Sequence, residues 1–378
     1  MKKALLVANL AGFASFLVSD IDILLENGYE IVFAANGSCL AWEDTRKELE
    51  KRNVRFVHLD FHSQNPLAKQ NVKAFKELRQ LLKQEQFDLI HCHTPIAGLI
   101  ARLAAMGCRR KGARVLYTTH GLAFTEKSSW KTKLVYRTME DIGSRLCDGI
   151  ITINMADYAQ VEKMHCANVF YIHGVGVDIA RYRDVSVPRD AYRASIGVQP
   201  QDVMVLSVGE LSTRKNHQVI IDALSRFEDK ERYVYVICGN GINGGTGQML
   251  ARMAEEKGVR LNMLGFRRDI PELTKCSDIG AIPSIREGLG LAGVQSLAAG
   301  VPLVGSNVQG ICDYIEDGQT GFLCDPFDSE AFAGAIKKIE AMTEAERNYM
   351  KQRCISMSQN FDMEISAKER SAIYKQFI

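Results

Sequence analysis

The chain has 378 residues, of which 46% are hydrophobic and 24% charged, and its formal net charge is +2. This length exceeds one ordinary domain, and the composition is that of a globular protein with apolar material for two cores. So small a net charge excludes a strong positive field, and nucleic acid is not an expected partner. Residues 1–180 carry 23 Lys and Arg against 19 Asp and Glu. This mild excess of positive charge is either ordinary scatter, or it forms a surface that faces an anionic membrane or an anionic acceptor.

The start of the chain resembles a signal peptide, but its apolar run is interrupted by Asn9 and followed by Asp20 and Asp22. We expect instead a strand at Ala4–Ala8, a loop at Asn9–Gly12 and a helix to about Glu26. Further apolar, β-branched runs predict strands that alternate with helices, as in a parallel sheet covered on both faces. These strands are Ile31–Ala35, Val54–Leu59, Leu89–His93, Val115–Thr119 and Ile150–Ile153.

The alternation restarts after a polar segment, Asp178–Gln201. We therefore expect two α/β domains, at 1–180 and 195–361, and a last helix at 362–378 that returns to the first domain. The second set of strands is Val203–Val208, Tyr233–Cys238, Arg260–Leu264, Asp278–Pro283 and Val301–Gly305.

Ten cysteines are scattered singly without a CxxC pair, which is typical of a reducing compartment. His91 and His93 share a face of a predicted strand, as two zinc ligands would, but no second ligand cluster follows at suitable spacing. No metal site is expected. No apolar stretch has the roughly 18 residues of a membrane span. We expect a cytoplasmic protein, with peripheral contact at the inner membrane face open.

A first polar group follows the first strand of the second set. Gly209 permits a tight turn, Glu210 follows it, and Arg214 and Lys215 precede a helix that Asn216 is expected to cap. Two cations beside free helix N–H groups suit a diphosphate. A solvated charged loop is the competing interpretation, and this segment alone does not exclude it.

A second group is a glycine-rich turn between a strand and a helix. Gly288 and Gly290 let the backbone approach a ligand, and the N–H groups near Leu289 and Leu291 point at an anion. Glu287 lies at the lip of this turn, where a carboxylate can bind sugar hydroxyls. A carboxylate beside glycines and opposite a cation pair is hard to explain as packing.

Candidates in the first domain also follow strands, at the edge where open α/β sheets bind ligands. His120 precedes a glycine at the end of one strand and is favoured as a functional residue over a structural one. His93 ends another strand, and Gly12 lies in the first loop. Both are acceptor-side candidates.

Two motifs are rejected as cofactor or metal sites. Gly239-Asn-Gly-Ile-Asn-Gly244 spells GxGxxG after a strand, but no acidic residue ends the next strand, as a dinucleotide site requires. We interpret Gly239 and Gly241 as a close backbone approach to the ligand. Asp20-Ile-Asp22 spells DxD, but within a helix these carboxylates point apart, which predicts surface and packing roles.

Together these motifs resemble the retaining GT-B glycosyltransferases of family 4, in their bacterial capsule and exopolysaccharide branch, over nearly the whole chain. Arg286-Glu-Gly-Leu-Gly-Leu291 with Leu-Ala-Ala-Gly-Val-Pro302 is similar to the family's EGxG…EAxAxGxP signature. The other similar segments are Val208–His217, Asp88–Pro95, Thr119-His-Gly121, Ile151-Thr-Ile-Asn154 and Gly174-Val-Gly-Val-Asp178.

The resemblance implies two Rossmann-like domains that face a central cleft and a nucleotide-sugar donor, most often UDP. The cation pair would neutralise the leaving diphosphate without metal or other cofactor. Glu287 would hold sugar hydroxyls, His120 would lie near the reacting sugar, and the backbone after Gly288 would bind phosphates. Gly265 and Phe266 would lie beside the base. The acceptor would be a glycan or lipid-linked sugar in surface polysaccharide synthesis.

The chain departs from the pattern at Gln295, where the family has a second carboxylate that grips the ribose. Exchange of a charged for a neutral hydrogen bond weakens binding by about 1 kcal/mol. Gln295 motivates one alternative, a non-catalytic nucleotide-sugar-binding protein. A second alternative is a nucleotide-sugar epimerase, since some epimerases share the GT-B architecture. The epimerase would need further acid/base carboxylates, which these loops lack.

Overall fold

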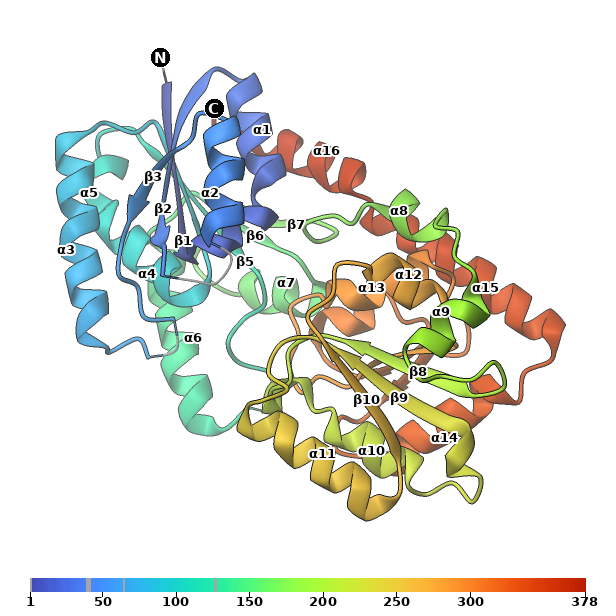
Figure 1. Ribbon diagram of the computed structural model, residues 1–378. Helices are drawn as coiled ribbons and strands as arrows, with labels where there is room; N and C mark the ends of the chain where they lie inside the picture. The colour runs from blue at the N-terminus through green and yellow to red at the C-terminus, as the bar shows by residue number, and fades with distance from the viewer. Residues whose placement is uncertain (1, 39–41, 64, 126–127) are drawn as a thin grey trace. The chain divides into compact units, whose positions relative to one another are not determined.

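The computed structural model describes residues 2–38, 42–63, 65–125 and 128–378. The chain forms two compact units (Figure 1): unit 1 is Met1–Val175 with Glu364–Ile378, and unit 2 is Gly176–Met363. Each unit has a parallel sheet with helices on both faces, as the alternation of strands and helices predicts. The chain thus passes from unit 1 to unit 2 after Val175, five residues before residue 180, where the first domain was expected to end.

Unit 1 contains a seven-stranded sheet in the order β3-β2-β1-β4-β5-β6-β7. Alternate residues of β1 enter different cores, Leu5 and Val7 on one face, Ala4 and Leu6 on the other. Burial on both faces explains why such strands are continuous apolar runs. The strands are β1 Lys2–Leu10, β2 Tyr29–Asn36, β3 Arg55–His58, β4 Leu89–His93, β5 Arg114–Thr119, β6 Gly149–Thr152 and β7 Val169–Tyr171. The helices are the 3-10 turn Ala11–Phe16, α1 Val18–Glu26, α2 Trp42–Lys51, α3 Lys69–Gln84, α4 Pro95–Ala104, α5 Met106–Arg109, α6 Trp130–Ser144 and α7 Met155–Val161.

Helix α16 (Met363–Tyr374) joins unit 1 through buried polar contacts. Arg370 Nη1 lies 3.3 Å from Asp20 Oδ2, and both side chains are only 4% exposed. The Tyr374 hydroxyl donates to Asp20 Oδ1 at 2.9 Å, and Ser366 Oγ donates to the carbonyl of Gly174 at 2.6 Å. These contacts anchor the last helix to α1 and to the loop after β7.

Unit 2 contains a six-stranded sheet in the order β10-β9-β8-β11-β12-β13, again with a core on each face. The segments that enter and leave it are paired: Val177 N donates to Phe361 O at 2.9 Å, and Met363 N donates to Val177 O at 3.1 Å. The strands are β8 Val203–Val208, β9 Tyr233–Cys238, β10 Arg260–Gly265, β11 Ile279–Ile282, β12 Leu303–Ser306 and β13 Gly321–Cys324. The helices are α8 Ile179–Arg183, α9 Arg189–Ser195, α10 Gln218–Leu224, α11 Gly245–Lys257, α12 Ile270–Lys275, α13 Leu291–Ala298, α14 Ser329–Glu340 and α15 Glu344–Ser358, with 3-10 turns at Thr213–Lys215, Lys230–Arg232, Gln309–Asp313 and Gln359–Phe361.

Two predictions about unit 1 are wrong, and one short edge strand of each unit was missed. Asn9–Gly12 is not a loop, because β1 continues through an irregular register to Leu10, a 3-10 turn starts at Ala11, and Asn9 Oδ1 accepts from Ala97 N at 3.0 Å. Asp20 is not on the surface, because it is buried against α16. The short edge strands β7 and β13 were not expected at all.

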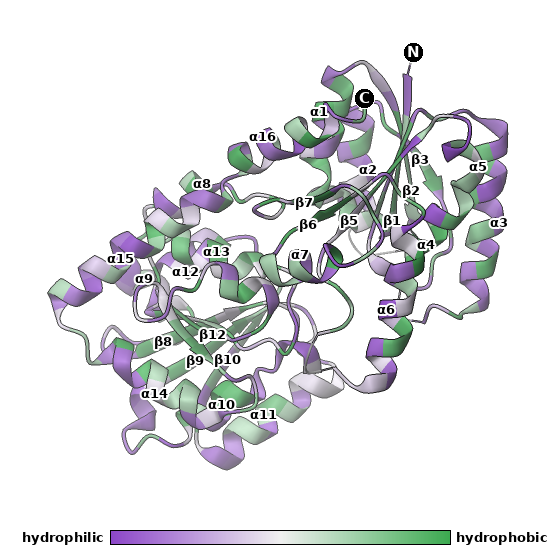
Figure 2. Cartoon of the chain, turned by 180° about the vertical axis from the view of Figure 1, so that it is seen from behind, coloured by the Kyte–Doolittle hydropathy of each residue, from purple (hydrophilic) through white to green (hydrophobic). Residues whose placement is uncertain are grey.

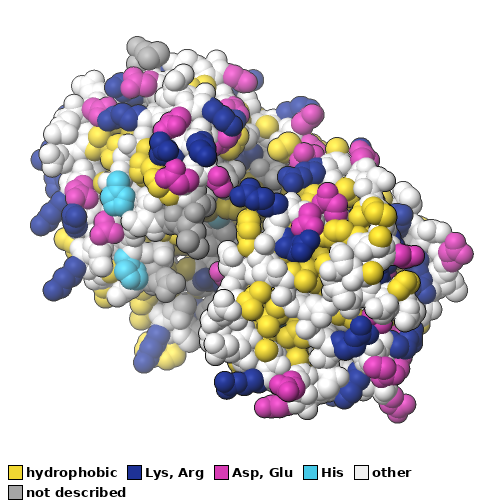
Figure 3. All heavy atoms as spheres, viewed as in Figure 1, with side chains coloured by type: hydrophobic (Ala, Val, Ile, Leu, Met, Phe, Trp, Pro, Cys, Tyr) yellow, Lys and Arg dark blue, Asp and Glu magenta, His cyan; other side chains and the backbone are white. Residues whose placement is uncertain are grey.

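Figure 2 shows the hydrophobic strands enclosed by helices whose outer faces are hydrophilic. On the face seen in Figure 3, Lys and Arg side chains are mixed with Asp and Glu, so neither unit presents a field of one sign there. No helix in the described part of the chain is long and apolar enough to cross a membrane.

Candidate functional site

The polar groups predicted after β8 and β11 meet in unit 2, because these two strands are neighbours in its sheet. Lys215 Nζ lies 2.6 Å from Glu287 Oε2, and Arg214 Nη1 lies 3.2 Å from the same oxygen. Ser284 Oγ donates to it at 3.0 Å. We call these four residues, Arg214, Lys215, Ser284 and Glu287, the Glu287 cluster.

The three donors of this cluster converge on one carboxylate oxygen. Among the described residues none donates to Glu287 Oε1, and the side chain is 13% exposed. Burial by itself raises the pKa of Glu287, but the charges of Lys215 and Arg214 outweigh it and lower the pKa below its usual value. The carboxylate is therefore ionised at neutral pH, with one oxygen fixed and the other available as an acceptor.

The glycines of the two loops allow this close arrangement. A Cβ on Gly209 would lie 3.1 Å from Lys215 Cε, and one on Gly290 would lie 2.9 Å from Glu287 Cγ. Gly290 has φ +79° and is the N-cap of α13, which begins at Leu291. A glycine N-cap leaves the first N–H groups of this helix without a side-chain acceptor, which favours a bound anion. Positive charge, a carboxylate oxygen and helix N–H groups thus come together.

Two supporting residues, Ser284 and Gln309, were missed. Gln309 Oε1 accepts from Glu287 N at 3.2 Å, although Gln309 has φ +33°, a strained value for a non-glycine residue. The next residue, Gly310, packs so closely that its Cβ would lie 2.1 Å from the carbonyl oxygen of Gly288. Ser284 lies three residues before Glu287 in the same turn and was recognisable by that spacing, whereas nothing local marks Gln309.

The structure corrects the predicted role of Asn216 and explains two glycines of the GxGxxG motif. Asn216 does not cap α10, whose N-cap is His217. It adopts a left-handed conformation, and its Nδ2 donates to the carbonyls of Pro283 and Pro326. A Cβ on Gly239 would lie 1.9 Å from Gly209 O, and Gly241 has φ +107°. Both glycines therefore have a structural role against the β8 loop.

The other donor-side candidates lie in the same unit, in or beside the loops after its strands. Glu210 Oε1 accepts from Arg214 Nη2 at 3.2 Å. Leu289 is buried below the turn, and Gln295 is half-buried on α13, where no described residue accepts from or donates to its amide. Phe266 follows Gly265 at the end of β10, and its ring is largely exposed, with the Arg268 guanidinium 5.9 Å from the ring centroid. An exposed ring of this kind can stack on a flat ligand.

In unit 1 the structure brings together His91, His93 and His120, which we call the histidine cluster. His93 Nδ1 lies 3.2 Å from His120 Nε2, and the rings of His91 and His93 are 4.2 Å apart. Phe13, next to Gly12, packs against His120 with the ring centroids 4.6 Å apart. The acceptor-side candidates therefore share one place at the carboxyl ends of β1, β4 and β5.

Burial lowers the pKa of His91 to about 4 and that of His120 to about 3, and it also lowers the pKa of His93. All three rings are neutral at neutral pH. The Tyr374 hydroxyl donates to Asp20, so its oxygen accepts from His91 Nδ1–H at 2.6 Å, and His91 Nε2 accepts from Thr118 Oγ1 at 2.8 Å. This chain fixes the tautomer of His91.

Two ring nitrogens of the histidine cluster are not used by the contacts described so far. His93 Nε2 is buried without a partner in the part of the chain that the structure describes. His120 uses Nε2 toward His93, which leaves Nδ1 for another group. Within the described ranges, no three His, Cys, Asp or Glu side chains are grouped in a way that holds a metal ion.

Asp20 and Asp22 diverge, as the helix predicts. Asp20 pairs with Arg370, whereas Asp22 pairs with Arg52, the residue after α2, with Arg52 Nε 2.7 Å from Asp22 Oδ1. They do not form one site.

Comparison with known proteins agrees with this two-domain arrangement. Residues 22–181 match the family model described as Glycosyltransferase Family 4, and residues 188–355 match Glycosyl transferases group 1. The chain is 33% identical over 319 residues to the putative glycosyltransferase EpsD of Bacillus subtilis strain 168, covering 82% of this chain and 80% of that protein.

A second relative is the Escherichia coli UDP-Gal:alpha-D-GlcNAc-diphosphoundecaprenol alpha-1,3-galactosyltransferase, 28% identical, with 71% of this chain and 70% of that protein covered. Among solved structures, Anabaena Alr3699/HepE in complex with UDP and glucose superposes over 100% of both chains with a TM-score of 0.80 at 20% identity, a likeness of fold. The chain therefore belongs to the GT-B glycosyltransferases of family 4.

Proposed function

We propose that the protein transfers a sugar, with retention of anomeric configuration, from a UDP-sugar to a glycan or lipid-linked acceptor in surface polysaccharide synthesis. The observation that carries the proposal is the Glu287 cluster, in which two cations and a carboxylate with one unused oxygen adjoin the N-terminus of α13. Arg214 and Lys215 bind the diphosphate, and Glu287 Oε1 accepts from sugar hydroxyls. The names of two relatives support the donor and acceptor classes, since one acts on a diphosphoundecaprenol-linked sugar and another was solved with UDP and glucose.

In this proposal the cluster replaces a metal ion. Two positive charges and helix N–H groups neutralise the charge that develops on the leaving diphosphate. From unit 1, His120 contacts the reacting sugar through Nδ1, while His93 and Gly12 belong to the acceptor side. The leaving phosphate oxygen takes the acceptor proton as the acceptor attacks from the same face, so no enzyme nucleophile is required.

Nucleotide binding tests the donor site. Thermal shift and calorimetry with UDP, GDP, ADP, CMP and their sugar conjugates, with EDTA present, should show stabilisation by UDP and one UDP-sugar. In Arg214→Met the dissociation constant of UDP should rise at least about tenfold, since a charge-assisted hydrogen bond contributes about 1.5–3 kcal/mol. Arg226→Met is the matched control, because this exposed arginine of unit 2 donates to Ser329 Oγ, outside the cluster. No shift with any nucleotide, or equal shifts in both variants, would refute the donor site.

Product analysis separates the remaining alternatives. With an α-linked donor, proton NMR of the product should show an α anomer, and a β product would refute retention. UDP-sugar binding without transfer to any lipid-linked acceptor would favour the non-catalytic alternative that Gln295 raises. A donor sugar converted to its epimer without transfer would favour the epimerase.

Helix α6 supports peripheral contact with the membrane that would carry such an acceptor. Trp130 is 69% exposed, and Leu134, Val135 and Ile142 are also exposed, beside the cation Lys131. Figure 1 shows α6 extending past the carboxyl edge of the sheet of unit 1. An exposed apolar stripe with adjacent positive charge favours an anionic lipid surface. By sequence, the aromatic and basic segment Lys127–Arg137 suits either a membrane contact or an ordinary solvated helix, and its first residue, Lys127, lies outside the described residues.

Vesicle sedimentation at low salt tests the membrane contact. The wild-type protein should pellet with anionic vesicles, and Trp130→Ser with Leu134→Ser should abolish this. Phe327→Ser, which removes an equally exposed aromatic side chain from unit 2, is the control. Equal pelleting of both variants would rule out α6 as the contact.

A further inference from the structure

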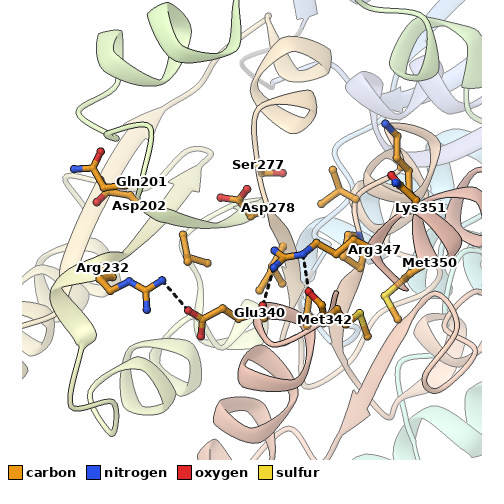
Figure 4. A pocket seen from close by; sticks show the side chains of 17 residues that line it. Gln201, Asp202, Arg232, Ser277, Asp278, Glu340, Met342, Arg347, Met350 and Lys351 are labelled. Atoms are coloured by element: carbon orange, nitrogen blue, oxygen red, sulfur yellow. Dashed lines mark hydrogen bonds and ion pairs between the residues drawn. The ribbon is translucent and has the colours of Figure 1, made fainter. Parts of the chain in front are cut away.

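A cavity of about 440 Å³ lies in unit 2 at the amino ends of β8, β11 and β12. The Glu287 cluster follows the carboxyl ends of β8 and β11, so the cavity is at the other edge of the same sheet. Helices α14 and α15 complete its wall (Figure 4). Its volume is within the range of sites that hold small organic ligands.

The carboxylates of this cavity are already neutralised. Asp202 pairs with Arg260, with Oδ1 2.8 Å from Nη1. Asp278 pairs with two arginines of α9, and Glu340 lies 3.0 Å from Arg232 Nη2, a pair drawn in Figure 4. Their negative charge is therefore not available to bind a cation.

Two cations of α15 are not neutralised in this way. Arg347 donates to the main-chain oxygens of Met342 and Glu340 at the end of α14, at 2.9 and 3.0 Å. No ion pair joins Arg347 or Lys351 to a carboxylate anywhere in the described ranges. They are four residues apart on one helix, so both side chains leave the helix on the same side.

The stem of Lys351 is seated in the wall of the cavity. A Cβ on Gly300 would lie 2.7 Å from Lys351 Cγ. The lysine side chain therefore packs against the backbone at a position where glycine leaves space for it. Lys275 is close enough that its pKa is lowered, first by burial and then by the charge of Lys351. Because the carboxylates of the lining are already paired, Arg347 and Lys351 leave positive charge at the cavity that an anion would compensate.

The floor of the cavity is apolar and buried. Ile279, Val301, Ile339 and Met350 line it. An apolar floor under a cationic rim suits a ligand with one apolar part and one anionic group. Water molecules in the cavity would find no hydrogen-bond partners on this apolar floor, so an apolar group fits there better.

We propose that this cavity binds a small molecule that carries a phosphate or carboxylate group on a short apolar body, with Lys351 at the anionic group and Met350 under the apolar part. The proposal is independent of the donor site, because it uses no residue of the Glu287 cluster. It adds a second ligand site to unit 2.

Methyl NMR of protein labelled with carbon-13 at methionine methyl groups tests the proposal, because Met342 and Met350 both line the cavity. Phenyl phosphate and benzoate are the probes, and benzyl alcohol is the neutral control. The methyl signals of Met342 and Met350, assigned through Met→Leu variants, should shift in a saturable way with the two anions and not with benzyl alcohol. If benzyl alcohol shifts them equally, the anionic part of the proposal is wrong.

The variant Lys351→Gln keeps the Cβ and Cγ atoms of the stem, of which Cγ lies against Gly300, and removes the charge. It should raise the dissociation constant of phenyl phosphate at least about tenfold, the loss expected for one charge-assisted hydrogen bond. Lys257→Gln, an exposed lysine of α11 in the same unit, should leave it unchanged. The response must also persist in Arg214→Met, which separates this cavity from the donor site. Absence of any saturable shift in the wild-type protein, or equal affinity in Lys351→Gln, would overturn the proposal.

Discussion

Arg370→Met should destabilise unit 1 by about 3 kcal/mol. The substitution keeps most of the side-chain volume but leaves the buried Asp20 carboxylate without its ionic partner. Removal of one member of a buried ion pair costs about 3–5 kcal/mol. The lower end applies here, because Asp20 keeps the hydrogen bond from Tyr374, although the variant also loses the bond from Arg370 to Val175 O. For a unit of this size the loss corresponds to about 6–12 °C in Tm.

Thermal unfolding measures the loss, and hydrogen exchange followed by mass spectrometry locates it. Faster exchange is expected in α1, β4 and α16. The double variant Asp20→Asn with Arg370→Met should recover about 2 kcal/mol relative to the sum of the single variants, since no unpaired charge remains. Lys368→Met, an exposed site on the same helix, should stay within about 0.5 kcal/mol of wild type. The reasoning fails if Arg370→Met is equally stable, or if exchange rises in unit 2 alone.

Three further predictions follow from other features. Gly239→Ala should destabilise unit 2 by about 3 kcal/mol, because the new Cβ would clash with a backbone oxygen. Gly245→Ala is the control and should not destabilise it, because no atom lies within 4 Å of a Cβ at that position. Equal melting temperatures of the two variants would contradict this. The histidine cluster should make unit 1 acid-labile. The pKa values of its histidines are lowered from about 6.5 in the unfolded chain, so unfolding takes up protons below pH 6.5. The free energy of unfolding therefore falls from pH 6.5 toward pH 4, by up to about 1.4 kcal/mol per pH unit per histidine. A Tm that stays flat from pH 6.5 to 5 would refute that. If the proposed donor site is correct, Gln295→Glu should tighten UDP-sugar binding by about 1 kcal/mol in calorimetry, and unchanged affinity would argue against a ribose contact there.

The parallel α/β architecture was predictable because both faces of each central strand are buried. The bounds of β4, β8 and β9 are as expected from their apolar runs. The edge strands β7 and β13 have only three and four residues, and several of these are half-buried, so no comparable run marks them. Their pairing depends on the neighbouring strand and not on local pattern.

The Glu287 cluster was predictable in part. Its members follow two strands, and the rule that ligands bind at the carboxyl ends of strands groups them. Contact between Lys215 and Glu287 requires β8 and β11 to be neighbours, which no local pattern specifies. The burial of Asp20 has the same origin, because its partner Arg370 is 350 residues away in sequence.

The paired segments at Val177 and Phe361–Met363 make unit 2 a continuous insertion whose two ends meet. A Cβ on Gly176 would lie 2.5 Å from Met363 Cα, so a side chain there would push the two segments apart. Domains with adjacent termini can be expressed alone or permuted, because their removal leaves only a short gap in the rest of the chain. Residues 176–363 are therefore a natural unit for isolated expression, and the remainder of the chain can be joined by a short linker.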